Sequence, residues 1–402
     1  MTGRRIVITG LGGVSAIGAS ADQIWQAMRE GRCGLGPLTF ERRDLRTNIG
    51  GELGDIDLSA IDERARQAMG GFSVLAVLAA GQAIRAAGLD LAAEDPARMG
   101  AAVGVAIWGA DAVDQSYSDI FLDGKKRAHI LTVPRAMPSA PAGQISMQYG
   151  LRGPVFGLTS ACSSSNHALS AAVDQLRLGR ADVMLAGGAD TPLVYGIVKV
   201  WESLRVLARQ ACRPFSADRD GLVLADGAGI AILETLEHAR ARGAPILAEV
   251  IGCGLSADAA DIVSPTVEGP AAAMQACLND AGIPPEAVDY INAHGTATKA
   301  NDRTETQAIR AVFGAHADSL SVSSTKSMHG HCLGASGAIE LIACVNAIRH
   351  GLVPPTIGYT TPDPECDLDV TPNEARQRKV EVAISNAFAF GGMNAVIALR
   401  GI

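Results

Sequence analysis

The strongest constraint on the fold is that the two halves of the chain repeat one order of expected elements. Residues 80–105 predict a helix, a turn, a short spacer and an apolar strand, and residues 272–296 predict the same series. Residues 155–183 and 320–353 each predict a strand, a polar turn and a helix of small residues. Such a repeat indicates a duplicated βαβ-type unit. We therefore expect an α/β protein of two related halves.

The halves are placed at residues 1–245 and 246–402, with an insertion at about 109–150 in the first. The carboxyl ends of equivalent strands can meet at one crevice, so polar residues that follow those strands are the candidates for a site. Near the N-terminus, residues 4–13 predict a buried strand that runs into a glycine-rich turn.

Composition argues against several classes of protein. The formal net charge of −8 disfavours nucleic-acid binding, because phosphate contacts require a basic field. The eight cysteines show no CxxC spacing, which favours reduced thiols in a cytoplasmic protein over a disulfide framework. No apolar stretch is long enough for a transmembrane segment, although peripheral association with a membrane surface stays open.

Cys162 lies where an expected strand ends and an expected helix begins. Serines occupy the next three positions, 163–165, where hydroxyl groups can cap the free N–H groups of a helix start. The helix dipole and those N–H groups would favour a thiolate and can hold an oxyanion. An inert buried cysteine is the alternative, and the position alone does not decide between the two.

The second half carries further reactive side chains at the equivalent strand ends. His294 follows an apolar strand. Lys326 and His331 lie between the next strand and a helix that carries Glu340. A thiol and two imidazoles suit acyl transfer with carbanion chemistry, because a thiolate can hold an acyl group while two neutral N–H donors stabilise an enolate. A nearby lysine would keep the imidazoles neutral.

Four motifs, in order along nearly the whole chain, resemble those of type II β-ketoacyl-[acyl-carrier-protein] synthases, condensing enzymes of the thiolase superfamily. They are TSACSSS, NAHGTATKANDRTE, STKSMHGHCLGASGAIE and NAFAFGGMNA. The resemblance implies a thiolase-like five-layered α-β-α-β-α sandwich. It also implies an acyltransferase that extends a fatty acyl chain by two carbons, through decarboxylative Claisen condensation of malonyl-carrier. Within the family, the sequence is most similar to the nodulation type, whose members extend specialised, often unsaturated chains.

The resemblance implies a role for each reactive residue. Cys162 would be the acylated nucleophile. His294 and His331 would be the decarboxylation pair. Lys326 would be the supporting cation, and Glu340 would be a buried structural partner.

The same resemblance implies a gate, a tunnel and a docking surface. The backbone N–H groups of Cys162 and Phe390 would form an oxyanion hole. Phe390 would gate substrate entry from a loop that also contains Phe388. Ile107 and Trp108 would lie at the floor of the acyl tunnel, by a dimer interface. An acidic acyl carrier protein would dock on four cations: Lys125, Lys126, Arg127 and Arg209.

No metal or organic cofactor is expected, because the substrates arrive on the phosphopantetheine arm of the carrier protein. His329, His331 and Cys332 look like metal ligands in isolation, but three ligands within four residues make poor tetrahedral geometry. The expected partners are acyl carrier protein and a second copy of the chain, as a homodimer. Neither nucleic acid nor a transmembrane segment is expected.

Several other functions compete with the condensing enzyme. A degradative thiolase would need a second cysteine in the C-terminal loop, which reads FAFGGMN. A Cys-His hydrolase would leave His331 and Lys326 without a role. A ketosynthase subunit of a type II polyketide or polyene system is an alternative. A non-catalytic chain-length partner subunit is another, although such subunits lack the cysteine that stands at position 162 here.

Overall fold

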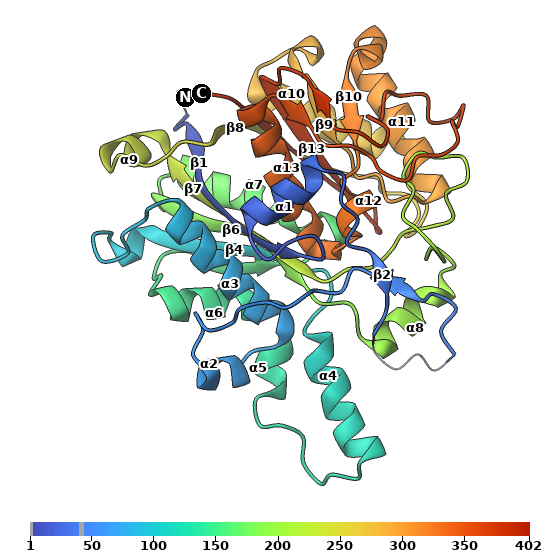
Figure 1. The fold of residues 1–402 in the computed structure, drawn as a ribbon. Coiled ribbons are helices and arrows are strands. Elements are labelled where there is room, and N and C mark those ends of the chain that lie inside the picture. The colour runs from blue at the N-terminus through green and yellow to red at the C-terminus, as the bar shows by residue number, and fades with distance from the viewer. Residues whose placement is uncertain (1–2, 40–43) are drawn as a thin grey trace.

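The computed structural model describes residues 3–39 and 44–402, and Figure 1 shows its fold. The strands are β1 (Ile6–Ser15), β2 (Gly36–Pro37), β3 (Ile49–Gly50), β4 (Met99–Gly104), β5 (Val155–Leu158), β6 (Val183–Asp190), β7 (Gly227–Thr235), β8 (Ala248–Ala257), β9 (Tyr290–Asn292), β10 (Ser321–Ser323), β11 (Leu352–Val353), β12 (Arg376–Gln377), β13 (Val382–Ala389) and β14 (Met393–Arg400).

The helices are α1 (Ala21–Arg29), α2 (Glu63–Gln67), α3 (Gly71–Ala86), α4 (Ala110–Tyr117), α5 (Thr132–Ala136), α6 (Ala140–Tyr149), α7 (Ser164–Arg177), α8 (Tyr195–Ser203), α9 (Leu236–Ala241), α10 (Glu268–Ala281), α11 (Lys299–Phe313), α12 (Lys326–His329) and α13 (Ser336–His350). Two short helical turns also matter for the site: η3 (Ala161–Ser163) and η6 (Leu333–Ala335). Within the described residues, no helix is long and apolar enough to cross a bilayer.

The main sheet shows the duplication directly in its strand order. Ten strands follow one another as β10-β9-β13-β14-β8-β1-β7-β6-β4-β5. At the centre of the sheet, β1 of the first half pairs with β8 of the second. The other four strands of each half extend outward from this pair in matching positions. In each half the first strand lies innermost, and two parallel strands form the outer edge. We infer that each half is one copy of the repeated unit.

The layers are those of the expected α-β-α-β-α sandwich. Helix α3 packs on β1 and β7 at the outside of the first half, and α10 packs on β8 and β14 at the outside of the second. Helices α7 and α13 contact strands of both halves and form the middle layer. Figure 1 shows α3 and α6 on one side of the molecule and α10 and α11 on the other. Each helix of the middle layer begins shortly after a candidate motif, α7 after Cys162 and α13 after His331. The site therefore lies at the N-terminal ends of these two helices.

The prediction of a glycine-rich turn near the N-terminus is wrong, because the glycines concerned lie inside β1. A Cβ atom at Gly12 would approach the carbonyl oxygen of Ala79 to 1.9 Å, and one at Gly10 would approach that of Ala83 to 2.2 Å. Both carbonyls belong to α3. The glycines are therefore required for the close packing of α3 on the strand, and they do not mark a turn.

The insertion in the first half forms a projecting arm and one packed helix. Helix α6 packs on α3, whereas α4 and α5 extend away from the body (Figure 1). Large apolar side chains on this arm are exposed; Phe121 is 76% and Ile130 is 91% exposed. Exposed apolar surfaces of this kind are typical of interaction sites.

His238 on α9 bridges two carboxylates that lie far apart in the sequence. Its Nδ1 lies 2.7 Å from Glu234 Oε2, and its Nε2 lies 2.9 Å from Glu94 Oε2. The hydrogen bond with Glu234 raises the pKa of His238 in spite of its partial burial. Although burial opposes ionisation, hydrogen bonds from Arg242 and His238 lower the pKa of Glu234 to about 2. The charged histidine therefore links α9 to the segment that follows α3.

We expect His238→Gln to destabilise the protein by about 1–2 kcal/mol at pH 6 and by much less at pH 9. A histidine with a raised folded pKa stabilises fully below its unfolded pKa, near 6.5, and loses that contribution as the pH rises through the folded pKa. Urea unfolding at both pH values measures the difference, with His129→Gln on the exposed arm as the control. Equal destabilisation at both pH values would mean that His238 contributes only by packing.

Candidate active site

Cys162 lies at the junction that the sequence indicated, in the turn η3 between β5 and α7. The preceding residue, Ala161, has φ +48°, a left-handed conformation that non-glycine residues seldom adopt. The Cys162 side chain is 7% exposed and lines a cavity together with His294 and His331. We call this space the central cavity. Residues of both halves of the chain line it around the thiol.

The serines after Cys162 do not cap α7, contrary to the expectation. Ser163 and Ser164 donate to carbonyl groups of the turn before them, at 2.8 and 2.7 Å. Ser165 donates to the carbonyl of Gly334 in η6. The hydroxyl groups therefore shape the approach to the helix and bind it to the second half, and they leave its own N–H groups uncapped.

The expectation of a thiolate at Cys162 in the resting protein is also wrong. Burial raises the pKa of the thiol to about 12, and the charge of Lys326 only partly opposes this. The helix start contributes a partial charge of roughly half a unit, which is too little to offset the loss of hydration around a buried anion. The thiol is therefore protonated at rest and must lose its proton as it attacks.

His294 and His331 lie beside each other, with ring centroids 5.4 Å apart and ring planes at 82°. His294 follows β9, and Lys326 begins α12, so the two motifs meet at the ends of neighbouring strands. Lys326 Nζ lies 3.5 Å from His294 Nδ1 and forms an ion pair with Glu340. Both members of this pair are fully buried. The structure thus brings together the reactive residues that the sequence indicated in the second half.

Both imidazoles are neutral. Burial lowers the pKa of His294 and of His331 well below the usual value, and the charge of Lys326 adds to the effect. The sequence predicted that Lys326 would keep the imidazoles neutral, but burial lowers their pKa values more than the charge of Lys326 does. Because an ammonium group can only donate, His294 Nδ1 accepts and its Nε2 carries the proton. His331 Nδ1 lies 2.8 Å from Ser336 Oγ, and its Nε2 has no hydrogen-bond partner among the described residues.

Glu305 holds the backbone at His294 and was not identified from the sequence. Its two carboxylate oxygens accept from the backbone N–H groups of His294 and Gly295, both at 2.8 Å. Asn386 on β13 donates to it at 3.1 Å. The carboxylate is fully buried, and burial raises its pKa. Its position in the NDRTE stretch, on α11 after the histidine loop, was the available signal.

Asp190, at the end of β6, is a second positioning residue that the sequence did not reveal. Its carboxylate accepts from the backbone N–H groups of Ala106, Ile107 and Gly334, at 2.8, 3.0 and 2.7 Å. The residue is fully buried, and burial raises its pKa to about 8. It therefore joins the end of β4 to η6, the turn that follows His331.

The loop in which a gate was expected lines the central cavity. Phe388, Ala389 and Phe390 line the cavity, at the end of β13 and in the turn toward β14. Among the described residues, no hydrogen-bond acceptor is found for the Phe390 N–H, whereas the Cys162 N–H donates to its own thiol. Neither N–H group is therefore bonded to another residue of the described chain. Other lining residues come from α8, from α11 and the segment before it, and from the loop at residues 258–265.

The expected tunnel residues occupy different environments. Ile107 packs against an apolar cluster that contains Cys162. Trp108 is 51% exposed and does not line the central cavity.

His329 is buried, with Nε2 3.1 Å from Thr325 Oγ1. Across the described residues, no group of three or more His, Cys, Asp and Glu side chains could hold a metal ion.

The expected docking cations separate into two places. Lys125, Lys126 and Arg127 lie on the projecting arm, and none of them lines the central cavity. Arg209 lines a second cavity, called the arginine cavity, whose walls are Arg46, Thr47, Glu202, Arg205, Leu207, Arg209 and Asp220.

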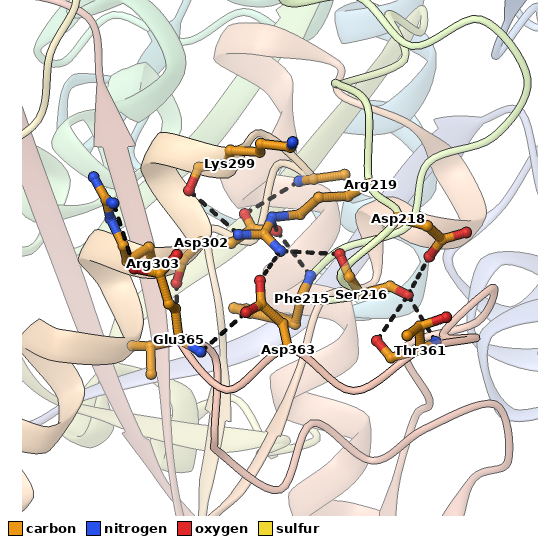
Figure 2. Close-up of polar contacts among 12 residues, drawn as sticks. Phe215, Ser216, Asp218, Arg219, Lys299, Asp302, Arg303, Thr361, Asp363 and Glu365 are labelled. Atoms are coloured by element: carbon orange, nitrogen blue, oxygen red, sulfur yellow. Dashed lines mark hydrogen bonds and ion pairs between the residues drawn. The ribbon is translucent and has the colours of Figure 1, made fainter.

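A buried arginine supports the wall of the central cavity that follows His294. Figure 2 shows Arg219 between Asp302 and Asp363, with its guanidinium group directed at the start of α11. It donates to the Ser216 carbonyl at 2.9 Å and, more weakly, to the carbonyls of Thr298 and Lys299 at 3.4 Å. Thr298 lines the cavity. Arg219 thereby connects a loop of the first half to a wall built by the second.

Family models match most of the chain. The β-ketoacyl synthase N-terminal domain matches residues 3–239, and the β-ketoacyl synthase C-terminal domain matches residues 247–360.

Individual relatives agree with these matches. Nodulation protein E from Rhizobium sp. (strain N33) is 60% identical over 99% of this chain and 100% of its own length. The 3-oxoacyl-[acyl-carrier-protein] synthase 2 of Coxiella burnetii is 40% identical, with 100% of both chains covered. A solved ketosynthase, in complex with its type II PKS acyl-carrier protein and bound to the hexaketide, has a TM-score of 0.90 and 32% identity over the whole of both chains.

The stretches MPSAPAGQISMQYGLRGPVFGLTSAC and CDLDVTPNEARQR also indicate similarity to nodulation protein E. With family models over both halves and a relative that is 60% identical along almost the full length, the chain belongs to the β-ketoacyl synthase family of thiolase-fold condensing enzymes.

Proposed function

We propose that this condensing enzyme transfers an acyl chain from acyl carrier protein to Cys162 and extends it with malonyl-carrier, between His294 and His331. One observation carries the proposal: a buried thiol and two neutral imidazoles line one cavity, with a buried Lys326–Glu340 pair behind them. The substrates would arrive on the phosphopantetheine of the carrier, in the cytoplasm, where thiols stay reduced.

The first half-reaction is a thioester exchange. Cys162 Sγ forms a bond to the acyl carbonyl carbon, and the bond from that carbon to the carrier sulfur breaks. The thiol proton leaves with the carrier sulfur, so the charge of the site does not change. The N–H groups of Cys162 and Phe390 stabilise the tetrahedral oxyanion.

The second half-reaction uses the two imidazoles. The bond between the malonyl carboxylate and Cα breaks, carbon dioxide leaves, and the electron pair forms the enolate of the carrier thioester. His294 Nε2–H donates to that enolate oxygen, and His331 joins it when its Nδ1 accepts from Ser336. The carbanion attacks the acyl-cysteine, and the released Cys162 sulfur takes one proton from solvent.

Intact-mass analysis with acyl-carriers of graded chain length, followed by malonyl-carrier, tests the proposed function. Acylation of the protein, followed by a product two carbons longer, is the expected result. Acylation followed by release of the free acid would show a hydrolase instead. Lack of acylation by any primer would favour a non-catalytic chain-length subunit, the second candidate that the presence of Cys162 disfavours.

The arginine cavity is the surface that we propose for carrier docking. The guanidinium groups of Arg46, Arg205 and Arg209 have no partner in the described part of the chain. The two acids of the cavity, Glu202 and Asp220, accept from backbone N–H groups. The cavity therefore presents unpaired positive charge. Helix α8 lines both cavities, through Trp201 and Glu202, so an acidic carrier bound here would lie beside the central cavity.

We expect Arg205→Glu combined with Arg209→Glu to raise the KM for acyl-carrier by about tenfold or more at low salt, and by less at high salt. Arg240→Glu, at an exposed position of α9, is the matched control. Titration of steady-state rates with acyl-carrier at two salt concentrations measures the effect. An unchanged KM would exclude the cavity, and the same reversal at Lys125, Lys126 and Arg127 would then test the arm.

We propose a homodimer that covers the arm. The exposed apolar side chains of the arm include Tyr117, Phe121, Leu122, Ile130 and Val133. The expected tunnel residue Trp108 lies at the base of the arm. A second copy would bury this face and bring Trp108 inside the assembly. We expect Phe121→Asp with Ile130→Asp to shift sedimentation from dimer to monomer, whereas Leu178→Asp, on exposed surface after α7, leaves it unchanged. Wild type that sediments as a monomer would contradict the proposal.

The acyl chain itself is a matter for substrate tests. We propose a specialised, unsaturated fatty acyl chain of the nodulation-factor type, because the 60% identical relative is a nodulation protein. A polyketide ketosynthase is the alternative, which the whole-chain likeness to a type II PKS ketosynthase favours. Competition between saturated, unsaturated and polyketide primers for acylation of the protein distinguishes the two.

A further inference from the structure

The ring of Phe390 stacks on Trp201, with centroids 5.9 Å apart and planes inclined by 24°. Phe390 belongs to the turn between β13 and β14 in the second half, and Trp201 belongs to α8 in the first. We propose that Trp201 is a latch that holds the Phe390 gate closed, and that this latch selects acyl chains by length. The inference rests on the proposed function and on the gate at Phe390 that the family resemblance implies.

The turn that carries Phe390 is anchored on both sides of that residue, because Ala389 pairs with Met393 and its carbonyl accepts from the Gly392 N–H at 3.0 Å. Gly391 and Gly392 have φ +81° and +67°, the left-handed region in which glycine is unstrained. The Gly391 N–H donates to the Ile262 carbonyl at 2.8 Å, and the Gly392 carbonyl accepts from the Asp258 N–H at 2.9 Å. The glycines are therefore anchored to a neighbouring loop. In the described chain, no hydrogen bond anchors Phe390 itself, and the Trp201 stack is its one aromatic contact.

The stack lies beside the thiol and the apolar cluster that would receive an acyl chain. Phe390 and Trp201 both line the central cavity with Cys162. Trp201 also packs against the apolar cluster, together with Ile107. The core members of that cluster are Cys162, Val198, Leu207, Leu222, Leu224 and Leu333. Displacing Phe390 from Trp201 would expose an aromatic wall next to Cys162.

The strength of the latch explains how it would discriminate. A stacked aromatic pair biases a two-state equilibrium by about two- to tenfold. The free energy gained when several methylene groups of an acyl chain are buried in the apolar cluster outweighs such a bias, whereas burial of one or two does not. A long chain therefore opens the gate fully by itself, and a short chain opens it only in part. Weakening the stack should help short primers and leave long primers unchanged.

Trp201→Ala and Trp201→Phe test the latch in stopped-flow acylation of Cys162 by saturating butyryl-carrier and palmitoyl-carrier. We expect the alanine variant to be acylated by butyryl-carrier about two- to tenfold faster, with palmitoyl-carrier unchanged. Phenylalanine keeps an aromatic partner and should hold the wild-type ratio within about twofold. Trp25→Phe, which removes a tryptophan stacked on His350, is the control.

Tryptophan fluorescence gives an independent readout. In a Trp108→Phe background, which removes the expected tunnel tryptophan, palmitoyl loading should change the emission of the parent protein and of Trp25→Phe, but not that of Trp201→Phe, because only Trp201 loses its ring partner. If Trp201→Ala does not fold, Trp201→Leu keeps apolar volume without stacking. An unchanged butyryl-to-palmitoyl ratio in a folded variant would overturn the latch alone. Absence of acylation in wild type would overturn the proposed function and the latch together.

Discussion

Cys162→Ala should abolish both acylation and condensation, with a loss of about 10⁴-fold or more in condensation rate. The expectation follows from geometry, because the thiol is the nucleophilic side chain of the first half that lines the central cavity with both imidazoles. Intact-mass analysis after incubation with acyl-carrier measures acylation, and product analysis after addition of malonyl-carrier measures condensation.

Cys33→Ala is the matched control for this loss. Cys33 is the exposed cysteine of the chain, and it does not line the central cavity. The control should acylate like wild type, which shows that the added mass resides at position 162. A Cys162→Ala protein that still gains the acyl mass would place the nucleophile elsewhere and contradict the proposed mechanism.

Removal of either imidazole should separate the two half-reactions. His294→Ala and His331→Ala should each lower the condensation rate by about 10²–10⁴-fold, since each removes one N–H donor from the developing enolate. Acylation of Cys162 needs neither donor and should continue, so the acyl-enzyme accumulates. Carbon dioxide release from malonyl-carrier and intact mass of the protein measure the two steps separately.

His329→Ala is the corresponding control. This residue has the same side chain and lies on the same short helix as Lys326, but it faces Thr325 and does not line the central cavity. Its condensation rate should stay within about tenfold of wild type, the limit set by loss of one buried hydrogen bond. If all three histidine variants lost activity equally, the effect would be structural and the assigned roles would be wrong.

The sequence predicted correctly where a residue lies when its position in a regular element carried the information. Cys162, His294 and His331 each follow an apolar strand, and the ends of those strands meet because the repeated halves fold alike. Predictions failed where long-range packing decided the outcome. The thiolate expected at Cys162 is a neutral thiol, because burial outweighs the helix start. The glycines expected to form a turn lie within β1, where α3 approaches the strand closely.

The sequence by itself determined the duplicated α/β plan, the family and the candidate side chains of the site, because these depend on local periodicity and on motifs with fixed spacing. Only the tertiary structure decided which other groups hold the site. Glu305 binds the backbone at His294, and Asp190 joins Ile107 to the turn after His331. The stack of Trp201 on Phe390 also joins segments far apart in the chain. Contacts of this kind leave no local pattern, since they exist only once the two halves have packed together.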